Sequence, residues 1–285
     1  MTKTNPDALD PIMTCFGGKG RTSDQIGEMI DKTEHTDYGE PFSCGASVYF
    51  KTKPRGKDFI NDINPFVTRF FRQLKAGFKY DQCDMTPSRE RWKQYKKDLV
   101  TEGIDIDPCK LLYLNKHSYG NKFSFDPDKG GYGNHDKKCN ARDDPSRCFI
   151  TRLTPESIKN YEKRMENTDV LNADYRDVVR QHDAPGMLLY MDPPYEDHAK
   201  DYNVDEGPVT PEEVAKTVRG LKNAKAIVSI NDSPRVRKAF EGMNFIPLCF
   251  KYTTNNNEGA PVCELLITNY ETKCEWNPDK KKVEC

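Results

Sequence analysis

The sequence predicts an α/β protein built on a doubly wound, mostly parallel sheet. Apolar stretches of strand length alternate with amphipathic stretches of helix length through the second half of the chain. That alternation is typical of parallel strands joined by crossover helices. The last two apolar stretches follow each other with no helix between them, which predicts a terminal antiparallel hairpin at one edge of the sheet. The 285 residues suffice for one large domain or for a domain with an insertion.

Each expected element rests on its apolar spacing and on the residues that bound it. The expected strands lie within 38–50, where a tight turn interrupts the segment, and at 58–62, 169–173, 187–191, 225–230, 246–252 and 263–270. The expected helices lie at 18–31 and 65–78, in part of 81–110, from 155 onward, and at 175–182, 211–222 and 233–240. Thr154 is the expected N-cap of the helix that Pro155 opens. Residues 121–147 lack apolar periodicity and are expected to form a long loop.

Composition narrows the class of protein. The content of 35% hydrophobic and 11% aromatic residues is too high for a disordered chain. No stretch approaches the roughly 18 apolar residues of a membrane helix, and residues 1–10 carry no signal-peptide core. We therefore expect a cytoplasmic protein, or one in another intracellular compartment. Because the ten cysteines form no Cys-x-x-Cys pair, we expect reduced thiols and no zinc site.

Charge is distributed unevenly along the chain. The net charge is −1, yet residues 51–152 carry 22 Lys and Arg against 14 Asp and Glu. A basic middle on an acidic body is typical of a protein that binds phosphates with one face. A solvated charged surface is the alternative interpretation.

The stretch 187–195, Met-Leu-Leu-Tyr-Met-Asp-Pro-Pro-Tyr, concentrates candidate chemistry. Pro193 and Pro194 cannot continue a central sheet ladder because proline lacks a backbone N–H. Asp192 therefore follows the carboxyl end of a strand, where open α/β sheets bind their ligands. The Asp192 carboxylate and the Pro193 carbonyl are acceptors, and Tyr195 offers a flat ring, a combination that suits a planar base with an amino group. A rigid turn without chemistry is the alternative.

Earlier strand ends supply the parts of a cofactor pocket. The turn at 42–47 consists mostly of small residues, so its backbone can approach a ligand closely. Asp62 ends the next expected strand, where acids in nucleotide-binding sheets accept hydrogen bonds from ribose. Gly-Gly-Lys-Gly at 17–20 fails the P-loop pattern, so Lys19 is interpreted as a lone cation for a ligand carboxylate. A helix N-cap for Asp62 and a surface position for Lys19 are the alternatives.

Seven short segments occur in one order along the chain. They are Gly-Gly-Lys at 17–19, Glu-Pro-Phe at 40–42, Asn-Asp-Ile-Asn at 61–64, Tyr-Leu-Asn-Lys at 113–116, Ala-Asp-Tyr at 173–175, Asp-Pro-Pro-Tyr at 192–195 and Glu-Leu-Leu-Ile-Thr-Asn-Tyr at 264–270. In these segments the chain resembles the Dam-like DNA adenine methyltransferases, in their alpha-type order. The resemblance implies a Rossmann-like catalytic core at 1–80 and 153–285 and a partly helical target-recognition insert at 81–152. It also implies S-adenosylmethionine as the cofactor, double-stranded DNA as the partner, and no metal. A restriction endonuclease that works with this protein without binding to it remains an open possibility.

The resemblance also implies roles for the residues at matching positions. Lys19 would lie near the methionine carboxylate, Asp62 at the ribose, and Asp192 between cofactor and substrate. The implied cofactor-binding set is Cys15, Phe16, Lys19, Phe42, Cys44, Gly45, Asp62, Asp174, Tyr175 and Asp192. The chain departs from the family at Cys44 and Ala46, which stand where the family turn has glycine, and at Cys15, where relatives have an aromatic residue. Ala46 can still allow close approach if its φ is negative.

The implied reaction transfers a methyl group to the exocyclic nitrogen of adenine, extruded from the duplex and stacked on Tyr195. Its catalytic residues would be Asp192, Pro193, Pro194 and Tyr195. The basic insert would contact DNA through Lys116, Tyr119, Asn121, Lys122, Asn134, Lys137, Lys138 and Arg142. Methylation of another planar amine, in cytosine or in RNA adenine, and a DNA-binding protein without catalysis are the alternatives.

Overall fold

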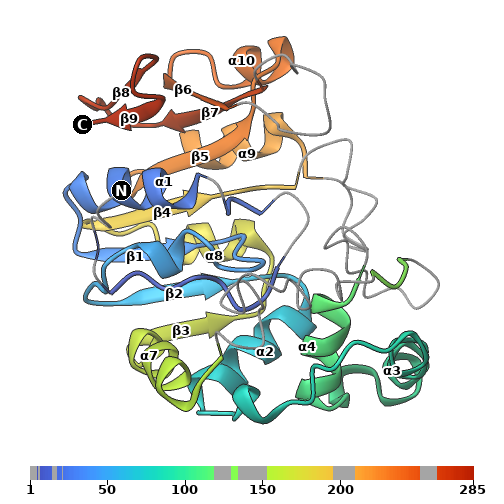
Figure 1. Ribbon diagram of the computed structural model, residues 1–285. Coiled ribbons are helices and arrows are strands. Elements are labelled where there is room, and N and C mark those ends of the chain that lie inside the picture. Colours follow the sequence, from blue (N-terminus) through green and yellow to red (C-terminus); the bar gives the residue numbers. More distant parts are fainter. Residues whose placement is uncertain are drawn as a thin grey trace.

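A seven-stranded sheet forms the centre of the part of the chain that the computed structural model describes, namely residues 5, 7–14, 18–20, 22–118, 130–133, 153–194, 209–250 and 262–285. Its strands are β1 (Asp37–Glu40), β2 (Asp58–Asn61), β3 (Thr168–Leu171), β4 (Met187–Met191), β5 (Lys225–Asn231), β6 (Asn244–Phe250) and β7 (Val262–Thr268). They run in the order β3-β2-β1-β4-β5-β7-β6, from bottom to top of Figure 1. The first five are parallel, and β7 is antiparallel to both β5 and β6. The predicted parallel sheet with an antiparallel edge hairpin is confirmed.

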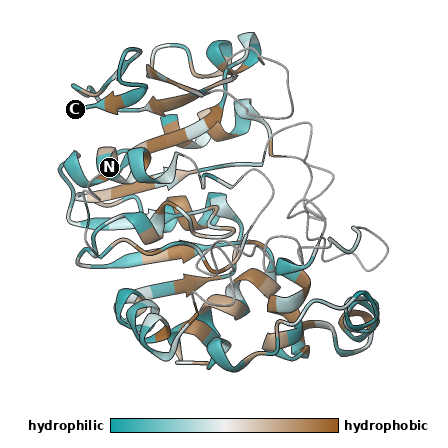
Figure 2. Cartoon of the chain, in the orientation of Figure 1, coloured by the Kyte–Doolittle hydropathy of each residue, from teal (hydrophilic) through white to brown (hydrophobic). Residues whose placement is uncertain are grey.

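Helices cover both faces of this sheet. Apolar residues of α1 (Ser23–Lys32), α2 (Pro65–Lys75) and α7 (Pro155–Met165) share one buried cluster with Tyr38 and Leu188. Those of α8 (Tyr175–Gln181), α9 (Pro211–Arg219) and α10 (Pro234–Ala239) share another with Leu189. Since neighbouring residues of a strand point to opposite faces, the two clusters are the two sides of one sheet. In Figure 2, hydrophobic residues, in brown, lie along strands of the sheet.

Several predicted boundaries shift for local reasons. The first helix begins at Ser23 rather than at 18, because the Thr22 N–H bonds the Lys19 carbonyl in a preceding turn. The helix from Pro65 ends at Lys75, two residues before Gly77, whose φ of +79° cannot continue a helix. A two-stranded hairpin of β8 (Glu275–Asn277) and β9 (Lys282–Glu284) was not predicted. None of the helices in the described ranges is long and apolar enough to cross a bilayer.

The described part of the predicted insert contains α3 (Arg89–Glu102) and α4 (Pro108–Lys116), at the lower right of Figure 1. Both helices bury apolar side chains, including Trp92 and Leu111, in the cluster that also holds Phe70 of α2. A disulfide between Cys83 and Cys109 joins the segment before α3 to α4. These helices are therefore anchored on the core.

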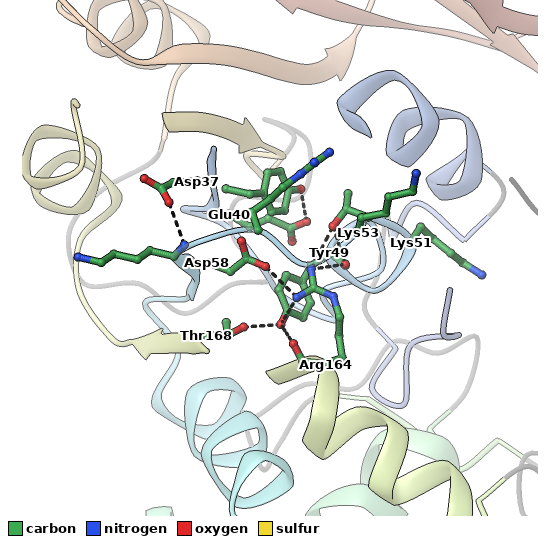
Figure 3. A network of polar contacts seen from close by, with 12 residues as sticks. Asp37, Glu40, Tyr49, Lys51, Lys53, Asp58, Arg164 and Thr168 are labelled. Atoms are coloured by element: carbon green, nitrogen blue, oxygen red, sulfur yellow. Dashed lines mark hydrogen bonds and ion pairs between the residues drawn. The ribbon is translucent and has the colours of Figure 1, made fainter. Parts of the chain in front are cut away.

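A buried arginine, Arg164, lies at the centre of a hydrogen-bonded network on the α7 side (Figure 3). Arg164 Nη1 donates to Asp58 Oδ2 and to the Tyr49 hydroxyl, each at 2.8 Å. The Tyr49 hydroxyl in turn lies 2.6 Å from Thr168 Oγ1. Because each charged group is paired, this network joins the end of α7 to the starts of β2 and β3 without an isolated buried charge.

The cysteines correct one expectation. Disulfides join Cys83 to Cys109, Cys249 to Cys263 and Cys274 to Cys285, and Cys44 is disulfide-bonded as well. The expectation of reduced thiols is therefore wrong for these positions. Cys249 and Cys263 face each other in the β6–β7 register with Cα atoms 4.1 Å apart, within bonding reach for a disulfide. That proximity follows from strand pairing, which the absence of Cys-x-x-Cys pairs could not reveal.

Candidate active site

The candidate site lies where the strand order reverses. β1 pairs with β2 on one side and with β4 on the other, so chain connections diverge between β1 and β4. Parallel α/β sheets bind ligands at the carboxyl ends of such a strand pair. The turn at 41–46 follows β1 there, and Asp192 follows β4. Because Gly39 and Leu189 are paired in register, these two segments leave the sheet beside each other.

Asp192 is held by a buried lysine. Lys19 is only 4% exposed, and its Nζ lies 2.7 Å from Asp192 Oδ1. The surface position considered for Lys19 is thus wrong. Burial raises the pKa of Asp192 to about 6, with Lys19 opposing the rise and the Glu264 carboxylate adding to it. At neutral pH Asp192 is therefore an ionised acceptor.

Glu264 of β7 is a second carboxylate near Lys19 that the sequence did not single out. Its Oε2 lies 3.6 Å from Lys19 Nζ and 3.5 Å from the donating hydroxyl of Ser229 on β5. Glu264 and Ser229 are 8% and 0% exposed. Three charged groups, from the residue after β4, from β7 and from the segment before α1, thus meet at one edge of the sheet. Glu264 lies 245 positions from Lys19 in the sequence, so the one signal was a charged residue inside an otherwise apolar strand.

The turn after β1 has positive φ angles at two positions, 44 and 46, that are not glycine. Cys44 and Ala46 have φ of +39° and +52°, in the region that side chains disfavour. The condition of a negative φ at Ala46 is therefore not met. The Ala46 N–H bonds the Ser43 carbonyl at 2.6 Å, and the Cys44 N–H bonds Asp62 Oδ2 at 2.9 Å. These bonds, with the disulfide of Cys44, hold the turn in its strained form.

Asp62 contacts this turn, and both of its carboxylate oxygens accept backbone hydrogen bonds. Its second oxygen accepts from the Asn64 N–H at 2.9 Å. The N-cap of α2 is Asn64, whose side chain accepts from the Phe66 N–H, so the alternative of Asp62 as the cap is wrong. Burial raises the pKa of Asp62 to about 6, while the Asn64 and Cys44 amides lower it.

Asn61 joins three strand ends and was not singled out from the sequence. Its side-chain amide donates to the Pro41 carbonyl at 2.9 Å and to the Ala173 carbonyl at 3.0 Å, and its oxygen accepts from the Ala173 N–H. The segments after β1, β2 and β3 are thereby fixed side by side. An asparagine at the end of a buried strand was the available signal.

Aromatic and acidic side chains flank this cross-link. The rings of Phe42 and Tyr175 lie 4.6 Å apart between centroids. Asp174 caps α8 by accepting from the Arg176 N–H and also pairs with the Arg176 guanidinium. The structure therefore brings Phe42, Cys44, Asp62, Asp174 and Tyr175 to adjoining strand ends. Gly45 lies in the same turn.

Glu40 is a further buried acid that the sequence did not single out. It is 2% exposed at the end of β1, and the Tyr38 hydroxyl donates to its Oε1 at 2.7 Å. Burial raises the pKa of Glu40 to about 8, with the Tyr38 hydrogen bond opposing the rise and Asp192 adding to it. Glu40 is therefore largely protonated at neutral pH.

Other predicted residues lie outside the described residues. These are Cys15, Phe16 and Tyr195, and the DNA-contact candidates Tyr119, Asn121, Lys122, Asn134, Lys137, Lys138 and Arg142. Pro193 and Pro194 follow Asp192, and Lys116 ends α4. Within the described ranges, no three His, Cys, Asp or Glu side chains are grouped so as to hold a metal ion.

Comparison with known proteins agrees with this geometry. The family model for D12 class N6 adenine-specific DNA methyltransferases matches residues 16–254. No curated protein matches the chain. The matched region includes Lys19, the turn after β1, Asp62 and Asp192, and ends before Glu264. Since it covers well over half of the sequence, the chain belongs to the D12 class of N6 adenine-specific DNA methyltransferases, enzymes that methylate adenine in DNA.

Proposed function

We propose that Asp192 and the Pro193 carbonyl accept the two N–H groups of the target adenine's amino nitrogen. The observation that carries the proposal is the position of Asp192, ionised and directly after β4 at the reversal of strand order. The lone pair of this nitrogen is delocalised into the ring. Two acceptors favour a tetrahedral nitrogen with a localised lone pair, and they stabilise positive charge that develops as the new bond forms.

The methyl donor in this proposal is S-adenosylmethionine, which supplies an electrophilic methyl group when bound. The strand-end residues fit such a molecule. Asp62 retains lone pairs for ribose hydroxyls, and Phe42 with Tyr175 offers aromatic surface for an adenine. Among the described residues, the buried Ser43 hydroxyl in the turn has no hydrogen-bond partner and is available to a ligand. Lys19 would contribute its cation near the methionine carboxylate.

The protein's own groups then manage charge and orientation. Asp192 orients the nitrogen toward the methyl group, and in-line alignment contributes to the rate. The nitrogen gains the methyl group as the S–CH3 bond of the sulfonium breaks to leave a thioether, and it then loses one of its protons to water, so adenine regains its neutral form. The scheme assigns no separate general base.

DNA recognition in the proposal belongs to the insert at 81–152. Its basic and amide side chains, Lys116 among them, would contact phosphates and base edges. Extrusion of the adenine costs a few kcal/mol, and stacking on Tyr195 would offset part of it. Because the substrate is DNA, we also propose that the protein acts in an intracellular compartment that contains DNA.

The direct test incubates the protein with methyl-labelled S-adenosylmethionine and duplex DNA and identifies the labelled nucleoside after digestion. We expect label in N6-methyladenine, and Asp192→Ala should abolish it while leaving duplex binding largely intact. Retained turnover in that variant would refute the role of Asp192. Sequencing of the modified DNA would supply the recognition site.

A further inference from the structure

The charged cluster at the candidate site, defined as Lys19, Asp192 and Glu264, contains one cation between two carboxylates. Lys19 Nζ lies 2.7 Å from Asp192 Oδ1 and 3.6 Å from Glu264 Oε2. The first distance is a direct charge-assisted hydrogen bond, and the second lies just beyond hydrogen-bonding range. A movement of the ammonium on the order of 1 Å, small for a lysine side chain, would exchange the two partners.

The two carboxylates of the cluster lie on one face of the sheet, and Lys19 contacts both. Leu188 and Tyr190 of β4 belong to the cluster under α1, so Asp192, in the same alternation, faces that side. Leu266 of β7 belongs to the same cluster, and Glu264 is in phase with it. β5 separates β4 from β7, and its Ser229 hydroxyl reaches the Glu264 carboxylate. Two members of the cluster are therefore fixed by strands, Glu264 on β7 and Asp192 directly after β4.

The arrangement raises a difficulty for the reaction. The Asp192 carboxylate, which is proposed to accept an adenine N–H, is already hydrogen-bonded to Lys19 through its Oδ1. An ammonium at that oxygen weakens it as an acceptor and repels positive charge on the adenine nitrogen. Asp192 becomes a stronger acceptor if Lys19 moves away from it as adenine binds, and a buried ammonium that leaves one carboxylate needs another. Besides the methionine carboxylate of a bound cofactor, the protein itself supplies Glu264, whose Oε2 lies 3.6 Å from Lys19 Nζ.

We propose that Glu264 is a positioning residue that receives Lys19 when adenine binds, and so frees Asp192 to hold the amino group. This inference rests on the proposed function. The second carboxylate also leaves the cluster with a net charge of −1, which stabilises a nitrogen that becomes positive. Without Glu264 the Lys19–Asp192 pair would be neutral and would hold its own hydrogen bond in place of the substrate's.

The test compares Glu264→Gln, which removes the charge with little change in shape, with Glu264→Asp, which keeps the charge one methylene further away. Glu271→Gln is the matched control, because it removes a carboxylate from an exposed position just after β7. We expect kcat of Glu264→Gln to fall at least about tenfold, with the KM for DNA rising by no more than about fivefold. Glu264→Asp should lose less, and the control should match wild type.

A binding measurement tests the transfer of Lys19 from Asp192 to Glu264 without turnover. Two duplexes are compared that carry either adenine or purine, which lacks the amino group, at the target position. Wild type should bind the adenine duplex about tenfold more tightly, as expected for a charge-assisted hydrogen bond. In Glu264→Gln this ratio should fall to within about twofold, because Lys19 stays on Asp192.

The outcomes separate the two proposals. A wild-type protein that methylates adenine, together with a Glu264→Gln variant of unchanged kcat and unchanged binding ratio, would overturn the role of Glu264 alone. Failure of wild type to methylate would contradict the proposed function, while the binding ratio would still test Glu264. If Glu264→Gln does not fold, Glu264→Ala, which also removes the carboxylate, takes its place with the same expected losses, and an unchanged kcat and binding ratio in that variant would refute the proposal.

Discussion

Replacement of Asp192 by asparagine should make the protein inactive and more stable at the same time. Burial raises the pKa of this carboxyl from 3.8 to about 6 even with Lys19 beside it. Its folded-state pKa is therefore higher than its unfolded-state pKa, so the folded state loses stability as the pH rises from 3.8 to about 6. Above that pH the loss is complete and constant.

The expected gain in the free energy of unfolding follows from the pKa shift of Asp192. About two pKa units correspond to about 3 kcal/mol, and to about 2 kcal/mol when screening of a partly exposed carboxylate is allowed for. The side chain of Asp192 is 21% exposed, so the lower figure applies. Asparagine resembles the protonated acid and does not incur this cost. The variant should gain about 2 kcal/mol at pH 8 and little near pH 4.

The assay is thermal or urea unfolding of wild type and Asp192→Asn at several pH values, with methylation measured on the same preparations. We expect a Tm increase of roughly 4–8 °C at pH 8, with kcat reduced at least about 100-fold. A variant that is equally or less stable at pH 8 would refute the idea that burial of this charge is costly. A stabilised variant with wild-type activity would refute its role in the reaction.

Three further predictions concern stability. Because the pKa of Glu40 is raised to about 8, the free energy of unfolding of wild type should fall by up to about 1.4 kcal/mol per pH unit from pH 5 to 8. Urea titrations of Glu40→Gln over the same pH range should not show this fall. Arg164→Leu leaves Asp58 buried without its cation and should lower the free energy of unfolding by about 3–5 kcal/mol. Calorimetry should show that adding Asp58→Asn restores part of this stability, and the absence of any recovery would contradict the pairing. Cys249→Ser opens the bond across β6 and β7 and should cost about 3 kcal/mol; dithiothreitol should lower the Tm of wild type more than that of the variant, and equal shifts would argue against this disulfide.

The mostly parallel sheet and the edge hairpin could be predicted because they follow from local patterns. Residues 187–191 form an apolar run cut off by two prolines, and the structure ends β4 at that place. Thr154 caps the helix that Pro155 opens, as the residue types indicate, with a reciprocal bond to Ser157. Such features depend on neighbours in sequence, so the sequence contains most of what determines them.

The charged cluster could not be predicted, because it depends on tertiary distances. Lys19 and Asp192 were each identified, but their direct contact requires the turn before α1 to lie over the end of β4. Glu264 belongs to a segment used only as a sign of resemblance. Glu40 was likewise part of a motif, and its burial depends on Tyr38 and on strands at both sides. Burial and pairing decide the charge states here, and neither is a local property.

The measurement that tests the central claim most directly is transfer of labelled methyl groups to duplex DNA by wild type and Asp192→Asn, followed by identification of the labelled nucleoside. Wild type should place the label in N6-methyladenine, and the variant should bind the duplex yet transfer none. Label in a cytosine derivative, or equal transfer by both proteins, would contradict the account.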